Sequence, residues 1–263
     1  MAQRSVLSTL SILIITLMIS ACSRQALYDN AIGWERSSAG LEESSITVGE
    51  MTIAYLSNAE PVDGDTIVLV HGFGANKDNW TRLARQLTDE FNVYAIDLPG
   101  HGDSSKELDL GYRFEDQVRH LSRILDALGV QRAHMMGNSM GGAITALYAA
   151  TYPDQILTIY DVMEEKAIAN RDVNEVIFDA IRDTGYEDDF RNAITRIQAP
   201  VLVVWGMEDR VINYRNADVF VERIPDARKV LLEGVGHAPM VEVPEESARL
   251  FREFVATATG QGK

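Results

Sequence analysis

The chain has 263 residues, of which 46% are apolar and 24% are charged. This composition is that of an ordinary globular protein, and the length suits one large α/β domain better than two small domains. The formal net charge of −15 argues against a nucleic-acid partner, because phosphate binding needs clustered Lys and Arg and the chain has no such run.

The N-terminus, residues 1–21, has the layout of a signal peptide. Arg4 precedes an apolar run at 6–19, and small residues follow at 20–21, directly before Cys22. A membrane-spanning helix needs about 20 predominantly apolar residues, so this shorter run favours a leader peptide over a permanent anchor.

Residues 19–22, Ile-Ser-Ala-Cys, resemble the lipobox of bacterial lipoproteins, in which the cysteine is lipidated and becomes the mature N-terminus. Cys22 is the only cysteine of the chain, and a mature domain without thiols suits an oxidising compartment. The resemblance implies a lipid anchor at Cys22, and Ser23 rather than Asp in the next position favours the outer membrane, facing the periplasm or the exterior. A plain signal peptide that happens to contain Cys22 is the alternative. Residues 22–44 are then expected to form a polar tether.

Alternating strand and helix patterns occupy the rest of the chain. Strands at 46–48 and 51–55 are expected to form a hairpin, and the β-branched run 66–70 is typical of a strand buried in a parallel sheet. Further strands are expected at 91–96, 133–136, 155–160, 200–206 and 229–232, and helices at 76–90, 114–128, 141–151, 216–223 and 244–256. This alternation predicts a mostly parallel sheet with helices on both faces.

A glycine-flanked serine follows the strand expected at 133–136. Residues 137–141, Gly-Asn-Ser-Met-Gly, fit the pattern G-x-S-x-G, in which the glycines let the backbone turn sharply and the serine projects from the strand's carboxyl end. The helix that begins near Met140 aims unpaired backbone N–H groups at the same place. Ser139 is therefore the candidate nucleophile, and a Gly-rich turn with an idle serine is the alternative.

A nucleophilic serine needs a neighbouring base, and the base needs a group that orients it. His237 lies in a Gly-flanked loop after the last expected strand, where its imidazole can reach the carboxyl edge of the sheet. The other four histidines are weaker candidates, because they lie within expected elements or precede the serine in the chain: His71, His101, His120 and His134.

An acid and an oxyanion-binding turn complete the candidate site. Asp209 follows the strand at 200–206, and the carboxyl ends of parallel strands meet at one edge, so Asp209 and His237 can meet Ser139 there. Asp161 also follows an expected strand and is the competing acid. Residues 72–74, Gly-Phe-Gly, follow the strand at 66–70 and offer N–H groups that could stabilise an oxyanion; a purely structural turn is the alternative.

Five motifs taken together resemble the α/β-hydrolase superfamily, and the match runs from about residue 46 to the C-terminal helix. They are His-Gly-Phe-Gly at 71–74, Asp-Leu-Pro-Gly-His-Gly-Asp-Ser at 97–104, Gly-Asn-Ser-Met-Gly-Gly at 137–142, Trp-Gly-Met-Glu-Asp-Arg at 205–210 and Gly-His at 236–237. Within the superfamily, the chain is most similar to bacterial lipases and esterases of lipolytic family V.

The resemblance implies an α/β-hydrolase fold over residues 45–258 and a role for each candidate residue. Ser139 is implied as the nucleophile, His237 as the general base and then acid, and Asp209 as the group that orients the histidine. Phe73 and Met140 are implied as the backbone donors to the oxyanion.

The expected activity is hydrolysis of a small-molecule ester or lipid through an acyl-enzyme. No cofactor or metal is expected, because no His, Cys and Asp cluster has ligand spacing. One alternative is a carbon–carbon-bond hydrolase of ring-cleavage products, which shares the Gly-Asn-Ser-Met-Gly-Gly form. Another is a non-catalytic envelope lipoprotein that uses the fold for binding.

The cap departs from the pattern of the relatives, which usually carry a multi-helix cap after the strand at 155–160. Only about forty residues separate Asp161 from Pro200, so we expect a shortened cap at about 162–197. Its apolar stripe either forms a small lid over Ser139 or packs on the sheet. A small cap offers little wall for a long acyl chain, so short- to medium-chain esters are expected. The stripe consists of Val173, Val176, Ile177 and Ile181.

Overall fold

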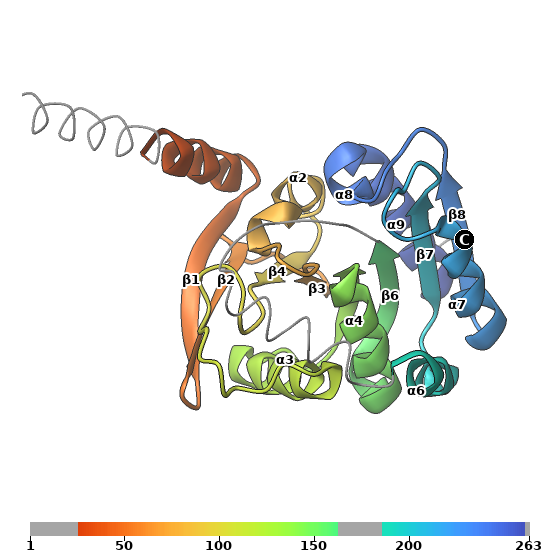
Figure 1. Ribbon diagram of the computed structural model, residues 1–263. Helices are drawn as coiled ribbons and strands as arrows, with labels where there is room; N and C mark the ends of the chain where they lie inside the picture. The colour runs from red at the N-terminus through yellow and green to blue at the C-terminus, as the bar shows by residue number, and fades with distance from the viewer. Residues whose placement is uncertain (1–25, 163–185, 261–263) are drawn as a thin grey trace, which may run out of the picture.

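A central β-sheet organises the protein, whose computed structural model describes residues 26–162 and 186–260 (Figure 1). The described residues form an eight-stranded sheet with the order β1-β2-β4-β3-β5-β6-β7-β8. β2 pairs antiparallel with β1 and β4, and all other pairs are parallel. The strands are β1 (Leu41–Val48), β2 (Met51–Asn58), β3 (Thr66–Val70), β4 (Asn92–Ile96), β5 (Ala133–Asn138), β6 (Ile156–Val162), β7 (Val201–Gly206) and β8 (Ala227–Leu232).

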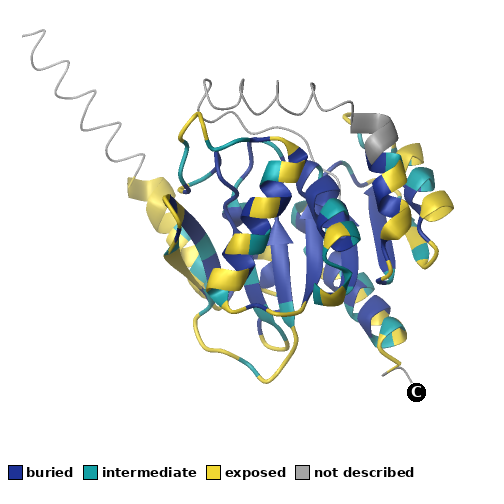
Figure 2. Ribbon diagram, turned by 90° about the horizontal axis from the view of Figure 1, so that it is seen from below, coloured by how far each residue is buried: buried dark blue, intermediate teal, exposed yellow. Residues whose placement is uncertain are grey.

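Helices cover both faces of the sheet and close a separate hydrophobic core on each face. One core joins the sheet to α3, α4, α6 and α7, and the other joins it to α2, α8 and α9. Figure 2 shows the central strands as almost entirely buried between these layers. The helices are α2 (Thr81–Ala84), α3 (Phe114–Leu128), α4 (Met140–Thr151), α6 (Tyr186–Ala193), α7 (Ala217–Arg223), α8 (Pro239–Glu242) and α9 (Pro244–Ala258), with short 3₁₀ turns η1 (Lys77–Trp80), η2 (Pro153–Gln155), η3 (Ile194–Arg196) and η4 (Tyr214–Asn216).

The sequence pattern accounts for the sheet. The apolar runs of β3 and β7 are buried on both faces, as expected for inner strands of a parallel sheet. The predicted hairpin is present and is longer than expected, since β1 and β2 pair from Leu41 opposite Asn58 to Val48 opposite Met51. The prediction of a mostly parallel sheet with helices on both faces is confirmed.

The long helix predicted at 76–90 is wrong in its extent. The structure has η1 and α2 and then a series of turns, in which the N–H groups of Gln86 and Leu87 bond to carbonyls three residues back. Trp80, Leu83 and Leu87 are nevertheless buried, as their spacing predicted. The spacing therefore identified the buried face, while tighter i→i+3 hydrogen bonds ended the α-helix early.

The structure also corrects the tether predicted at 22–44. Residues 26–38 are helical, and β1 begins at Leu41. The Arg36 guanidinium binds both carboxylate oxygens of Asp78, at 2.7 and 2.8 Å, and the Thr88 hydroxyl donates to the Ala39 carbonyl at 2.8 Å. Polar side chains that suggested a solvated linker thus bond to the body of the domain. The predicted signal peptide and Cys22 lie outside the described residues.

Part of the predicted cap belongs to the packed domain. Residues 163–185, which include Val173, Val176, Ile177 and Ile181, lie outside the described residues. After them, Ile194 is fully buried and the Phe190 ring lies 5.9 Å from the Phe220 ring of α7. Phe190, Ile194 and Ile197 therefore belong to one of the two cores.

Candidate active site

Ser139 lies at a strained corner between β5 and α4. Its backbone has φ 52° and ψ −116°, and it is the only non-glycine residue of the described chain with a positive φ. A conformation of this kind costs about 1–3 kcal/mol and persists only where the surrounding packing imposes it. The side chain is half-buried, so the corner holds it at the surface of the site in a geometry typical of a nucleophilic serine.

Glycines make the close packing of this corner possible. A Cβ on Gly137 would lie 2.5 Å from the Gly141 carbonyl oxygen, and a Cβ on Gly141 would collide with the Val70 carbonyl of β3. The start of α4 therefore lies directly against the end of β3. Only residues without a side chain fit at these two positions, which explains the G-x-S-x-G spacing.

Asp209 and His237 are in direct contact. Nδ1 of His237 lies at hydrogen-bond distance from Oδ2 of Asp209, and both side chains are buried. The Trp205 indole N–H also donates to Oδ2, at 2.8 Å, while the backbone N–H groups of Val211 and Ile212 donate to Oδ1 at 2.8 and 3.0 Å. These donors fix the carboxylate, and the carboxylate fixes the imidazole ring with Nδ1 toward it.

The topology gathers these residues at one edge of the sheet. Ser139 follows β5, Asp209 follows β7 and His237 follows β8, and these strands are parallel and lie within four consecutive places of the sheet. A Cβ on Gly206 would collide with the Gly236 carbonyl, so the end of β7 lies against the loop that carries His237. The structure thus shows a direct contact between Asp209 and His237, and Ser139 follows a parallel strand of the same sheet.

The predicted oxyanion turn adjoins the serine. A Cβ on Gly72 would lie 3.2 Å from the Ser139 Cβ and 3.1 Å from the Asn138 side-chain oxygen. Phe73 is the next residue along this turn, and Met140 follows Ser139 directly. The turn that was predicted to bind an oxyanion thus lies against the serine corner at Gly72, and the donor roles of the Phe73 and Met140 N–H groups remain a prediction.

Asp161, the competing acid, lies within β6 and not after it, because the strand extends to Val162. The side chain is buried, and a Cβ on Gly142 would collide with its carboxylate. The carboxylate is thus placed at the first turn of α4, where the positive end of a helix dipole favours a negative charge. Asp209 is the acid whose contact with His237 is direct.

His71 and His101 are buried neutral groups that support the oxyanion turn. Nε2 of His71 accepts a hydrogen bond from the Leu98 N–H at 3.0 Å, so Nδ1 carries the proton and donates to the Gly72 carbonyl at 2.7 Å. Burial lowers the pKa of His71 to about 4 and that of His101 to about 3. The two rings lie 4.8 Å apart.

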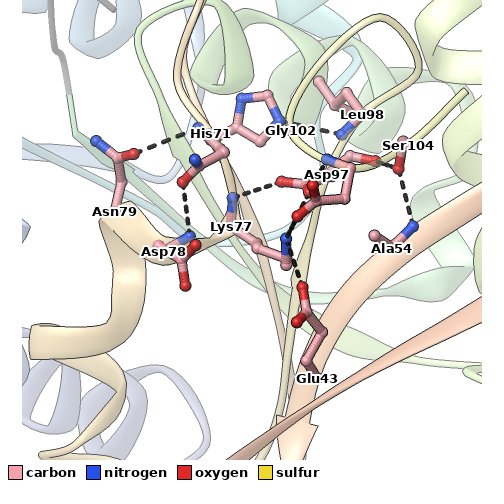
Figure 3. A network of polar contacts seen from close by, with 12 residues as sticks. Glu43, Ala54, His71, Lys77, Asp78, Asn79, Asp97, Leu98, Gly102 and Ser104 are labelled. Atoms are coloured by element: carbon pink, nitrogen blue, oxygen red, sulfur yellow. Dashed lines mark hydrogen bonds and ion pairs between the residues drawn. The ribbon is translucent and has the colours of Figure 1, made fainter. Parts of the chain in front are cut away.

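A buried lysine near the site has no signal in the sequence. The Lys77 side chain is inaccessible to solvent, and its ammonium lies 2.9 Å from Asp97, 2.6 Å from Asp103 and 2.9 Å from Glu43 (Figure 3). Burial alone would lower the pKa of Lys77, but these carboxylates outweigh it and raise that pKa above its usual range. The backbone N–H of Lys77 also donates a hydrogen bond to the Asp97 carboxylate, at 2.6 Å. The network ties the segment after the oxyanion turn to the loop at 97–104.

Comparison with known proteins identifies the family. The profile described as alpha/beta hydrolase fold matches residues 65–172 and 182–244. The chain belongs to the α/β-hydrolase family. It is 31% identical to Lipase 1 of Psychrobacter immobilis in an alignment 278 positions long, which covers 85% of this chain and 87% of the relative.

Solved structures agree with this assignment. A membrane phospholipase A described as a bacterial virulence factor is 29% identical, with a TM-score of 0.79 and coverage of 98% of this hydrolase and 99% of that chain. A putative lipase from Acinetobacter baumannii AYE is 24% identical, with a TM-score of 0.81 and coverage of 89% and 97%. The latter shows the shared fold.

We predict that Lys77→Met lowers the free energy of unfolding of this hydrolase by about 3–5 kcal/mol, because it leaves the Asp97 carboxylate buried without its cation. Chemical denaturation measures the change. Lys229→Met is the matched control, since Lys229 pairs with Asp218 at the surface and such pairs contribute only about 0–1 kcal/mol. Equal losses for the two variants would contradict the prediction.

Proposed function

We propose that this hydrolase cleaves carboxylic esters with Ser139 as nucleophile, His237 as general base and acid, and Asp209 as the group that orients His237. The observation that carries the proposal is the buried contact between Asp209 and His237 at the sheet edge that also holds the strained Ser139 corner. The names of the most similar relatives, which are lipases and a phospholipase, support an ester as substrate.

The reaction begins when the Ser139 hydroxyl oxygen attacks the ester carbonyl carbon and Nε2 of His237 accepts the hydroxyl proton. The negative charge that develops on the carbonyl oxygen is stabilised by the N–H groups of Phe73 and Met140. His237 then gives its proton to the departing alcohol oxygen, which leaves an acyl group on Ser139. A water molecule then attacks the acyl carbonyl carbon while Nε2 of His237 takes a proton from it. The bond between the acyl carbon and the Ser139 oxygen breaks as His237 gives this proton to that oxygen, which releases the carboxylic acid and restores Ser139.

Asp209 controls the tautomer of the histidine in this scheme. With the Nδ1 proton directed at Asp209, the lone pair of the ring is on Nε2, the atom that must accept the serine proton. The Trp205, Val211 and Ile212 donors keep the carboxylate from rotating away. Asp209 also stabilises the imidazolium that forms during each proton transfer.

A carbon–carbon-bond hydrolase of ring-cleavage products would use the same three residues. The names of the relatives at 29–31% identity favour the ester, because each is a lipase or a phospholipase. Parallel assays with p-nitrophenyl esters and a ring-cleavage product, each with a serine-directed phosphonate as inhibitor, separate the two. Turnover of the ring-cleavage product alone would reject ester hydrolysis, and no turnover of either substrate would favour a non-catalytic lipoprotein.

We also propose a shortened cap between β6 and α6. The alignment with Lipase 1 spans 278 positions, whereas 85% of this 263-residue chain is about 224 residues. About 54 positions of the alignment therefore have no counterpart in this chain. The sequence leaves only about forty residues between Asp161 and Pro200, where relatives carry the cap. A loss of this size in the cap would remove much of the wall that holds an acyl chain.

We predict that Ser139→Ala lowers ester turnover by at least about a thousandfold without unfolding the protein, since only binding and oxyanion stabilisation remain. Steady-state rates with p-nitrophenyl acetate, together with circular dichroism, provide the test. Near-normal turnover in the folded variant would falsify the assignment of the nucleophile.

We predict that Asp209→Asn lowers kcat by about 10⁴, because the amide no longer holds the Nδ1 proton and favours the wrong histidine tautomer. Asp161→Asn is the matched control: the same change in a buried acid, but in one placed against the start of α4. The control is expected to lose far less kcat. If Asp161→Asn is inactive and Asp209→Asn is active, Asp161 is the catalytic acid.

We predict that kcat/KM for p-nitrophenyl esters reaches its maximum at short or medium chain length. Each methylene that is removed from water gains about 0.8 kcal/mol, and this gain ends where the wall of a small cap ends. A series from acetate to palmitate measures the position of the maximum. A steady rise as far as palmitate would instead indicate a long-chain site.

We predict that the mature chain begins at a lipidated Cys22 in the outer membrane, on the basis of the lipobox resemblance at 19–22. Mass spectrometry should find the acylated cysteine at the N-terminus, and Cys22→Ala should move the protein from the detergent phase to the aqueous phase. An intact Met1, or unchanged partitioning of the variant, would count against the lipid anchor. Within the described residues, none of the helices has the length and apolar character of a membrane span.

A further inference from the structure

The helix at 26–38 presents large apolar side chains to solvent. Leu27 is 70% exposed, Tyr28 60% and Trp34 68%, and these are the three most exposed large apolar side chains of the described chain. Leu27 and Trp34 are seven residues apart and therefore share a face of the helix. Figure 2 shows most of this helix as exposed, in contrast to the central strands.

This helix is fixed to the domain and is not a loose end. Arg36 binds Asp78 through two hydrogen bonds, and its second terminal nitrogen lies 2.5 Å from Glu43 in β1. Asp78 belongs to η1, which follows the oxyanion turn at the carboxyl end of β3. The exposed face is therefore held in a defined orientation relative to η1 and β1.

Basic side chains border the apolar face. A groove of about 580 Å³ between this helix and α2 is lined by Trp34, Arg82 and Arg85, together with Glu35 and Glu245. Arg82 lies 3.6 Å from Glu35, whereas Arg85 is exposed and forms no ion pair with the described residues. In a chain with a net charge of −15, exposed arginines beside an exposed tryptophan suit a layer of lipid phosphate groups.

We propose that the exposed surface of this helix, formed by Leu27 and Trp34 on one face and by Tyr28 next to Leu27, docks on a lipid bilayer. Trp and Tyr prefer the headgroup region, and a leucine beside them can bury its side chain at the acyl boundary. Residues 1–25, with the apolar run at 6–19, end directly before this helix, so a membrane attachment in that segment would bring the helix to the bilayer surface. A second copy of this acidic chain is a weaker candidate for the occupant, because the contact between two apolar faces does not require the flanking arginines.

Docking by this face would direct the active site toward the membrane. Arg36 of this helix binds Asp78 of η1, and η1 follows the turn at 72–74, whose Gly72 lies beside Ser139, so a docked enzyme would take its substrate from the lipid layer. This orientation step depends on the proposed ester hydrolysis, but the docking itself does not.

Tryptophan fluorescence tests the docking directly. Trp34 is the single exposed tryptophan of the three in the chain, since Trp80 and Trp205 are buried. With the full chain on vesicles of brominated phosphatidylcholine and phosphatidylglycerol, we expect a blue shift and strong quenching, and Trp34→Phe should abolish both. Emission that is unchanged while the protein sediments with the vesicles would overturn the proposal.

Activity assays test the consequence of docking. The double variant Leu27→Glu, Tyr28→Glu should hydrolyse a medium-chain monoacylglycerol in these vesicles about tenfold more slowly per bound enzyme, because the two side chains lose their burial in lipid. Its kcat/KM for soluble p-nitrophenyl acetate should not change. Val221→Glu is the control, since Val221 is 37% exposed on α7, beside β8 at the opposite edge of the sheet.

The outcomes separate this proposal from the function. Equal losses on both substrates would show that the double variant damages the fold or the site, and would overturn the docking role. A dimer in solution that the double variant dissociates, without quenching of Trp34 by lipid, would assign the face to a second copy of the chain. Inactivity of the unmodified enzyme on p-nitrophenyl acetate would reject the proposed ester hydrolysis, while the quenching result would still decide the docking.

Discussion

The close packing of backbone around Ser139 is the constraint on which the rest of the structure depends. Ser139 holds a conformation that costs about 1–3 kcal/mol, and the segment can keep it only because α4 lies directly against β3 and β5. Gly137 and Gly141 permit that approach, since a side chain at either position would meet a carbonyl or another glycine of the corner. The parallel pairing of β3, β5 and β6 then holds the corner at one edge of the sheet.

Polar groups that are buried around this corner keep its loops in place. His71 and Lys77 belong to the segment that follows β3, whereas Asp97 and Leu98 belong to the loop that follows β4. His71 accepts a hydrogen bond from the Leu98 N–H, and the Lys77 ammonium binds the Asp97 carboxylate, so both contacts join the two loops. Removal of either link would leave a buried polar group without its partner, which costs more than a typical hydrogen bond contributes. The oxyanion turn therefore owes its shape to groups that take no part in the proposed chemistry.

The same network reaches the surface of the protein. Asp78 follows Lys77 in η1 and binds Arg36 of the helix at 26–38, and Glu43 of β1 contacts both Arg36 and Lys77. The helix proposed to meet lipid and the turn proposed to bind the oxyanion are thus joined by ion pairs over a few residues. A continuous set of contacts of this kind gives the two sites a fixed mutual orientation.

The sequence by itself determined the features that depend on local order: the strained serine turn from its glycines, the buried strands from their apolar runs, and the positions of Asp209 and His237 after strand ends. Only the tertiary structure decided that residues 26–38 pack as a helix, that Lys77 is buried and that Asp161 lies inside β6. The physical reason is that backbone conformation and periodicity act over a few residues, whereas Arg36–Asp78 and Lys77–Asp97 join residues 42 and 20 positions apart. The identity of a lysine or an arginine in the sequence does not reveal whether its side chain lies in water or beside a buried carboxylate. That environment is set by tertiary packing.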